Sequence, residues 1–65
     1  MTTATDIIEK LDIDLATATA EELQSKLYAL EDGEALKYMG LGDDDIPAIE
    51  EAYTLIENAL NAKKA

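Results

Sequence analysis

The chain has 65 residues, of which 15 are Asp or Glu and 5 are Lys, so its formal net charge at pH 7 is −10. Such a charge repels nucleic acid and anionic membranes, and we expect neither as a direct partner. Cys and His are absent, which excludes disulfides, thiolate metal sites and imidazole catalysis. Apolar residues make up 48% of the chain, too many for a disordered acidic tail, so we expect one folded acidic domain over residues 1–65.

The N-terminal stretch has the signature of a short helix. Thr3 and Asp6 have the spacing of a capping box, and apolar residues follow at helical spacing. This pattern predicts a helix at about residues 4–12. In residues 13–18, apolar and acidic side chains alternate over too short a stretch for a sheet, which predicts an extended connector that covers the core.

A second helix is predicted at about residues 19–32, where Thr19 opens another capping box and leucines follow three and four residues apart. Gly33 is its expected end, in the left-handed conformation that glycine adopts readily. The apolar stripe changes face at this point, which predicts a separate short helix at about residues 34–39, closed by Gly40. A single helix kinked at Gly33 is the alternative.

The last predicted helix covers about residues 44–61, with Pro47 in its first turn. Its main seam consists of Ile46, Ile49, Tyr53, Ile56 and Leu60; its alanine seam consists of Ala48, Ala52, Leu55, Ala59 and Ala62. A helix with two adjacent seams can pack against two neighbours, which makes the alanine seam a candidate protein interface. Tyr28 and Tyr38 join this candidate interface as anchors, but the interpretation that we favour for each is a partly buried core residue.

Catalytic, cofactor-binding and metal-binding residues are not expected. A calcium-binding loop that began at Asp43 would need Gly at its sixth position and Glu at its twelfth, but Ala48 and Thr54 occupy these positions. Ser25, the only serine, has no His or Cys to activate it. We therefore predict that the chain is not an enzyme and uses no cofactor. The remaining acidic residues of interest form a candidate acidic patch of Asp43, Asp44, Asp45, Glu50 and Glu51.

Part of the sequence resembles a known family. Over residues 36–60, the pattern resembles the helical opening of the phage head-to-tail connector family, and its matching positions are Leu36-Lys37, Gly40-Leu41, Asp43-Asp44-Asp45, Ile49, Ala52 and Ile56. The chain departs from that family at Pro47. The resemblance implies a structural subunit of a ring between portal and tail, with the alanine seam as a subunit contact. Residues 42–47 are also similar to the acidic turn before the last helix of bacteriocin immunity proteins, which are acidic bundles that block a basic nuclease.

Together these features predict an all-α bundle of three main helices with a short helix between the second and third. The leading hypothesis is a non-catalytic protein-binding structural or assembly subunit that associates with itself or with another protein. The alternative is an acidic inhibitor that covers a basic site, either immunity-like or a mimic of nucleic acid. Residues 1–4 lack the features of a signal peptide and no apolar run approaches the roughly 20 residues of a membrane span, so we expect a cytoplasmic protein, or a virion protein under the phage hypothesis.

Overall fold

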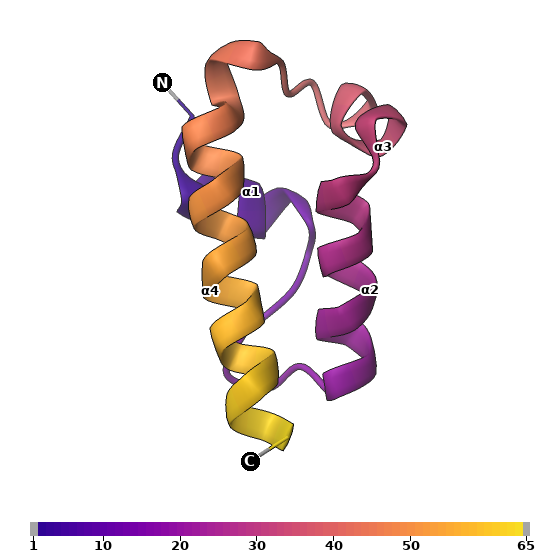
Figure 1. The fold of residues 1–65 in the computed structure, drawn as a ribbon, viewed down its shortest axis with the longest axis vertical. Coiled ribbons are helices and arrows are strands. Elements are labelled where there is room, and N and C mark those ends of the chain that lie inside the picture. The colour runs from indigo at the N-terminus through magenta and orange to yellow at the C-terminus, as the bar shows by residue number, and fades with distance from the viewer. Residues whose placement is uncertain (1, 65) are drawn as a thin grey trace.

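The computed structural model describes residues 2–64, which form four α-helices and one 3₁₀ turn without any strand (Figure 1). Met1 and Ala65, which belong to the domain expected over residues 1–65, lie outside the described residues. The elements in chain order are α1 (Ala4–Lys10), α2 (Ala20–Glu31), α3 (Gly33–Tyr38), η1 (Asp43–Asp45) and α4 (Ile46–Lys64). The predicted all-α class is confirmed. Helices α2 and α4 run side by side in opposite directions, and α1 lies behind them.

Both predicted capping boxes are present. The Thr3 hydroxyl accepts a hydrogen bond from the Asp6 N–H at 3.2 Å, and the Asp6 carboxylate accepts one from the Thr3 N–H at 3.1 Å. Thr19 and Glu22 form the same reciprocal pair at the start of α2, at 3.2 and 3.1 Å. Each box satisfies two backbone groups that would lack a partner inside the helix, which fixes where α1 and α2 begin.

The end of α1 and the connector differ from the prediction. Helix α1 stops at Lys10 because Asp12 has a φ of 56°, in the left-handed region, which a continuing helix does not allow. The connector is not extended throughout. The Ala18 N–H donates to the Asp14 carbonyl at 2.8 Å, and the Asp14 carboxylate accepts from the Ala16 N–H at 2.9 Å, so that the middle of the connector is a single turn.

The junction between α2 and α3 confirms two helices but corrects the role of Gly33. Asp32 is in an extended conformation, with φ −92° and ψ 112°, and its carboxylate accepts a hydrogen bond from the Glu34 N–H at 2.9 Å. It therefore caps α3, and Gly33 is the first residue of that helix. The prediction of a left-handed Gly33 was wrong, because an aspartate in this position can cap the next helix directly.

Gly40 closes α3 as predicted. Its φ is 79°, and its N–H donates to the Lys37 carbonyl at 3.0 Å, while the Leu41 N–H donates to the Leu36 carbonyl at 2.9 Å. These two bonds make up a Schellman motif, whose left-handed residue is usually glycine because glycine has no Cβ. The motif turns the chain back toward α4.

Helix α4 is longer than predicted at its C-terminal end. It begins at Ile46 after the single turn of η1, has Pro47 in its first turn as expected, and continues to Lys64 instead of ending near residue 61. Ala and Lys are good helix formers, which accounts for the extra residues. At its N-terminal end, the Asp45 carboxylate accepts a hydrogen bond from the Gly42 N–H at 3.0 Å and fixes the entry into the helix.

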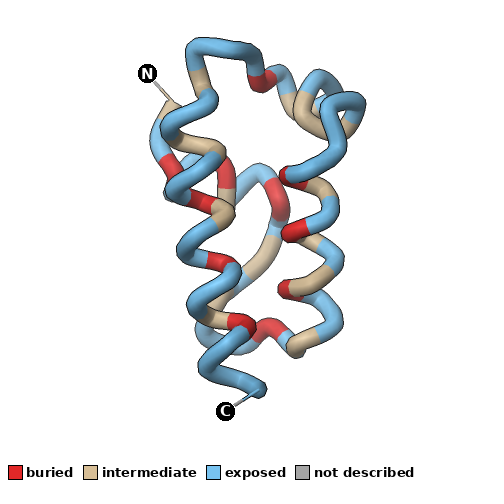
Figure 2. Tube along the Cα trace, viewed as in Figure 1, coloured by how far each residue is buried: buried red, intermediate tan, exposed pale blue. Residues whose placement is uncertain are grey.

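The core lies between α1, α2 and α4, and Figure 2 shows their buried positions facing one another. It contains Ala4, Ile7, Leu11, Ala18, Leu23, Leu27, Leu30, Leu41, Ala52, Ile56 and Leu60. Helix α4 contacts both α1 and α2, as its two seams predicted. Helix α3 packs against α2.

Candidate protein-binding surface

The alanine seam is not a free surface in this fold. Ala52 is completely buried, and Ala48 and Ala59 are half-buried against the core. Only Leu55, which is 39% exposed, and Ala62 lie open to solvent. The two neighbours that the seams predicted are α1 and α2 of the same chain, so the candidate interface through Ala48, Ala52 and Ala59 is used within the molecule. A partner cannot contact Ala52 while this fold is kept.

The exposed apolar surface lies instead at the start of α4. Ile46, predicted as the first residue of the main seam, is 47% exposed, and Ile49 is half-buried. Ile49 packs against the edge of the core, whereas Ile46 does not. The seam therefore extends beyond the core at Ile46, because α3 does not approach α4 closely enough to cover it.

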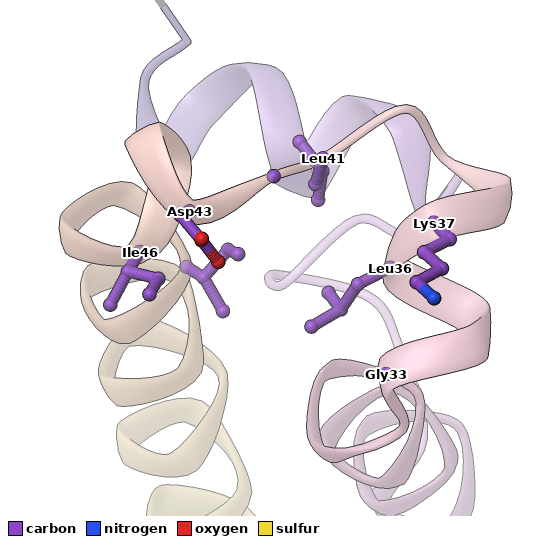
Figure 3. A pocket seen from close by; sticks show the side chains of 8 residues that line it. Gly33, Leu36, Lys37, Leu41, Asp43 and Ile46 are labelled. Atoms are coloured by element: carbon purple, nitrogen blue, oxygen red, sulfur yellow. The ribbon is translucent and has the colours of Figure 1, made fainter.

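An open pocket of about 440 Å³ separates α3 from the start of α4 (Figure 3). Leu36 and Lys37 of α3 lie on one side of it, Asp43 and Ile46 lie on the other, and Leu41 of the connecting loop lies between them. We call this pocket the α3–α4 groove; its complete lining is Gly33, Leu36, Lys37, Leu41, Gly42, Asp43, Ile46 and Ile49. Four of these residues are large and apolar, so the groove has a mainly apolar lining with charged groups beside it.

The walls of the groove are fixed by hydrogen bonds on both sides. The Schellman motif at Gly40 brings Leu36 and Leu41 together, and the Asp45 carboxylate holds the loop at Gly42. The Lys10 ammonium group donates to the Met39 carbonyl at 3.1 Å, which ties α1 to the end of α3. The pocket is therefore a feature of the folded backbone, which makes it a preformed site for an apolar group.

The candidate acidic patch divides into two parts. Asp43 lines the groove and Asp44 is exposed next to it, whereas Asp45 is half-buried and engaged with Gly42. Glu50 and Glu51 are both exposed on α4. Glu50 follows Ile46 by one helical turn and shares its face, while Glu51 points about 100° further round. The acidic groups beside the groove are thus Asp43, Asp44 and Glu50.

The three tyrosines have different environments. Tyr28 is 63% exposed and Tyr38 is 94% exposed, so the favoured interpretation of partly buried core residues was wrong for both. Tyr53 is half-buried, and its hydroxyl donates to Glu31 Oε1 at 3.2 Å, which links α4 to α2. Partial burial, and after it the nearby Glu31 carboxylate, raise the pKa of the Tyr53 hydroxyl above its usual value.

Sequence reasoning missed the three residues that open this surface, namely Leu36, Leu41 and Ile46. The available signal was the change of apolar face after Gly33, which left Leu36 and Met39 off the stripe of α2. A stripe that changes face indicates that the following helix packs elsewhere. The sequence does not show that the space between that helix and α4 stays open.

Within residues 2–64, no polar or charged side chain is buried, and no three His, Cys, Asp or Glu side chains gather in a way that could hold a metal ion. The expected absence of catalysis and cofactors stays a prediction. Of the helices in this part of the chain, none combines the length and apolar character needed to cross a membrane. Comparison of the chain with protein-family models, with curated proteins and with solved structures finds no significant match.

Proposed function

We propose that this protein is a non-catalytic subunit that binds another protein through the α3–α4 groove. The observation that supports this proposal is the half-exposed Ile46 at an open apolar pocket that also includes Leu36 and Leu41. Full burial of an isoleucine side chain stabilises a protein by roughly 1.5–3 kcal/mol, so covering the exposed half of Ile46 is worth about 1 kcal/mol. A partner side chain that fills the pocket would add a contribution of similar size to the binding free energy. Protein interfaces commonly combine such an apolar centre with a polar rim.

The resemblance to phage head-to-tail connectors supplies a structural setting for this proposal. Five residues of the groove lining fall on the positions that carry the resemblance, namely Leu36, Lys37, Leu41, Asp43 and Ile49. In a ring of subunits, the groove would take a segment of the adjoining subunit or of the portal or tail. The contact in that ring would lie at the groove and not at the alanine seam.

A second candidate function is an acidic inhibitor that covers a basic site. Every charged side chain of residues 2–64 is at least partly exposed, so the formal charge of −10 faces the solvent. Such a surface speeds the encounter with a basic partner, and the resulting binding weakens steeply as the salt concentration rises. A partner enzyme that loses activity in the complex would favour this candidate over the assembly subunit.

Site-specific photo-crosslinking in the cells that produce the protein tests the proposed function. A photoreactive residue replaces Lys37, which lines the groove, and in a matched variant it replaces Ala62, which is exposed near the C-terminal end of α4. We expect a crosslinked protein from position 37 but not from position 62, and its loss when Ile46→Ser is added. Mass spectrometry distinguishes a second copy from a different protein. Absence of any product that depends on Ile46 would refute binding through the groove.

A further inference from the structure

The charges around the α3–α4 groove select among its possible occupants. Asp43 lines the groove, Asp44 is exposed beside it, and Glu50 lies one turn from Ile46 on the same face of α4. Lys37 is the only cationic residue of the lining. The surroundings of the apolar pocket are therefore acidic, and they favour a cationic group that approaches next to an apolar side chain.

A second copy of the chain fits this surface poorly. It would bring another charge of −10 toward a surface of the same sign. Lys63 and Lys64 are the only two neighbouring cationic residues of the chain, and the nearest large apolar side chain before them, Leu60, is buried. The exposed apolar side chains nearest to a Lys are Tyr28, two residues after Lys26, and Tyr38, next to Lys37. Each has a single cation beside it, so the argument against a second copy rests mainly on its net charge.

The secondary structure around the groove indicates the backbone conformation of the occupant. An extended peptide binds well where it can add to a sheet edge, and residues 2–64 contain no strand. A helix satisfies its own backbone hydrogen bonds, so it can lie in a groove between helices and insert side chains spaced three or four residues apart. The pocket volume of about 440 Å³ falls within the roughly 300–1,000 Å³ of known ligand pockets, which leaves room for a large apolar side chain.

From this apolar lining and its acidic surroundings, we infer that the groove binds an amphipathic helix of another protein, with a large apolar anchor in the pocket and Lys or Arg about one turn away. This inference rests on the proposed function and names the chemistry of its partner. The anchor contacts Leu36, Leu41 and Ile46, and the cationic side chains face Asp43 and Asp44.

Selection from a phage-displayed library of helical peptides, randomised along one face, tests this inference on the intact folded chain. We expect the enriched peptides to share a large apolar residue flanked by Lys or Arg. An enriched peptide is then synthesised together with a counterpart in which each Lys or Arg is Glu. The basic peptide should bind and shift the NMR signals of Leu36, Leu41 and Ile46, and its acidic counterpart should not bind.

Matched variants separate the groove from the general acidity of the surface. Ile46→Ser should weaken binding roughly fivefold, as expected from the loss of about 1 kcal/mol of burial. Leu55→Ser changes a residue of comparable exposure about 180° round the same helix and should leave binding unchanged. Asp43→Asn combined with Asp44→Asn should weaken binding roughly threefold to tenfold and flatten its salt dependence. The control pair, Glu51→Gln with Glu57→Gln, removes the same charge away from the groove and should have less than about a twofold effect.

The outcomes distinguish failure of the partner chemistry from failure of the proposed function. If enriched peptides depend on Ile46 but carry neutral or acidic flanks, the basic-helix inference is wrong while binding through the groove stands. If no enriched peptide depends on Ile46, both fail. If signals of the groove residues shift when the concentration of the chain alone is raised, a second copy occupies the groove and the inference of a basic partner is overturned.

Discussion

Replacing Ala52 by Glu puts a carboxylate at a position where the side chain is completely buried. Its ionised form would lose its hydration among apolar residues, at a cost of several kcal/mol, and the larger side chain adds about 1–3 kcal/mol of overpacking. A chain of 65 residues has a total free energy of unfolding of about 3–10 kcal/mol. The loss is of the same size as the total, so we expect Ala52→Glu to be largely unfolded at 25 °C.

Ala62 provides a matched control because it belongs to the same alanine seam but is exposed. Substitutions at exposed positions usually change the free energy of unfolding by about 0.5 kcal/mol or less, which corresponds to a shift in Tm of no more than about 4 °C in a domain of this size. Far-UV circular dichroism should therefore show a helical, cooperatively melting Ala62→Glu variant next to an Ala52→Glu variant that has lost most of its helix signal.

Sedimentation of both variants decides whether the alanine seam acts within or between molecules. If Ala52→Glu melts like the natural chain and sediments as a smaller species, Ala52 contacts another copy and its burial in the core is wrong. The inference that the two seams of α4 pack against two helices of the same chain would then be refuted. The alanine seam would again be the candidate subunit contact that the phage resemblance implies.

Substitutions at four other positions test local features of the structure. Thr19→Ala removes a capping box and should lower the free energy of unfolding by about 1 kcal/mol, or Tm by about 4–8 °C. Thr17→Ala, in the connector, is the control and should change Tm little. Equal changes in Tm for the two variants would contradict the role of Thr19 as a cap. Gly33→Ala should raise the free energy of unfolding by up to about 1 kcal/mol, because Gly33 is helical. Gly40→Ala should lower the free energy of unfolding by about 1–2 kcal/mol, because the φ of Gly40 is 79°. Thermal melts in which both substitutions change Tm in the same direction would contradict these two conformations. Folding raises the pKa of Tyr53, so stability from its neutral hydroxyl is present below the unfolded pKa of about 10 and is lost as pH rises through the folded value. Denaturant melts should show a smaller alkaline loss in Tyr53→Phe, and identical losses would contradict the raised pKa.

Helix starts were predictable from the sequence because capping is local physics. Thr3 and Thr19 each bond to a residue three positions away, so the spacing alone contains the signal. Gly40 was predictable for the same reason. Gly33 was not, because Asp32-Gly33 has two local solutions, a left-handed end of one helix or the cap and first residue of the next. The following turn of chain decides between them.

Features that join distant parts of the chain were not predictable. The seams of α4 predicted two neighbours, but a seam does not say whether a neighbour belongs to the same molecule. The hydrogen bond from Lys10 to the Met39 carbonyl spans 29 positions and has no signature in either local sequence. The exposure of Ile46 likewise depends on where α3 ends relative to α4, which is set by the loop between them.

The break at Asp32 connects the fold to the groove. A continuous helix through residues 33–38 would extend α2 by about 9 Å along its own axis and carry Leu36 away from α4. The extended backbone at Asp32 instead turns α3 off that axis, and the Schellman motif at Gly40 returns the chain so that Leu41 is buried beside Leu36. With only six residues, α3 still cannot cover Ile46. Asp32, the polar residue that ends α2, therefore also leaves the apolar pocket open. If Asp32→Ala lets α2 continue into α3, we expect the helix boundary and the groove to be lost together.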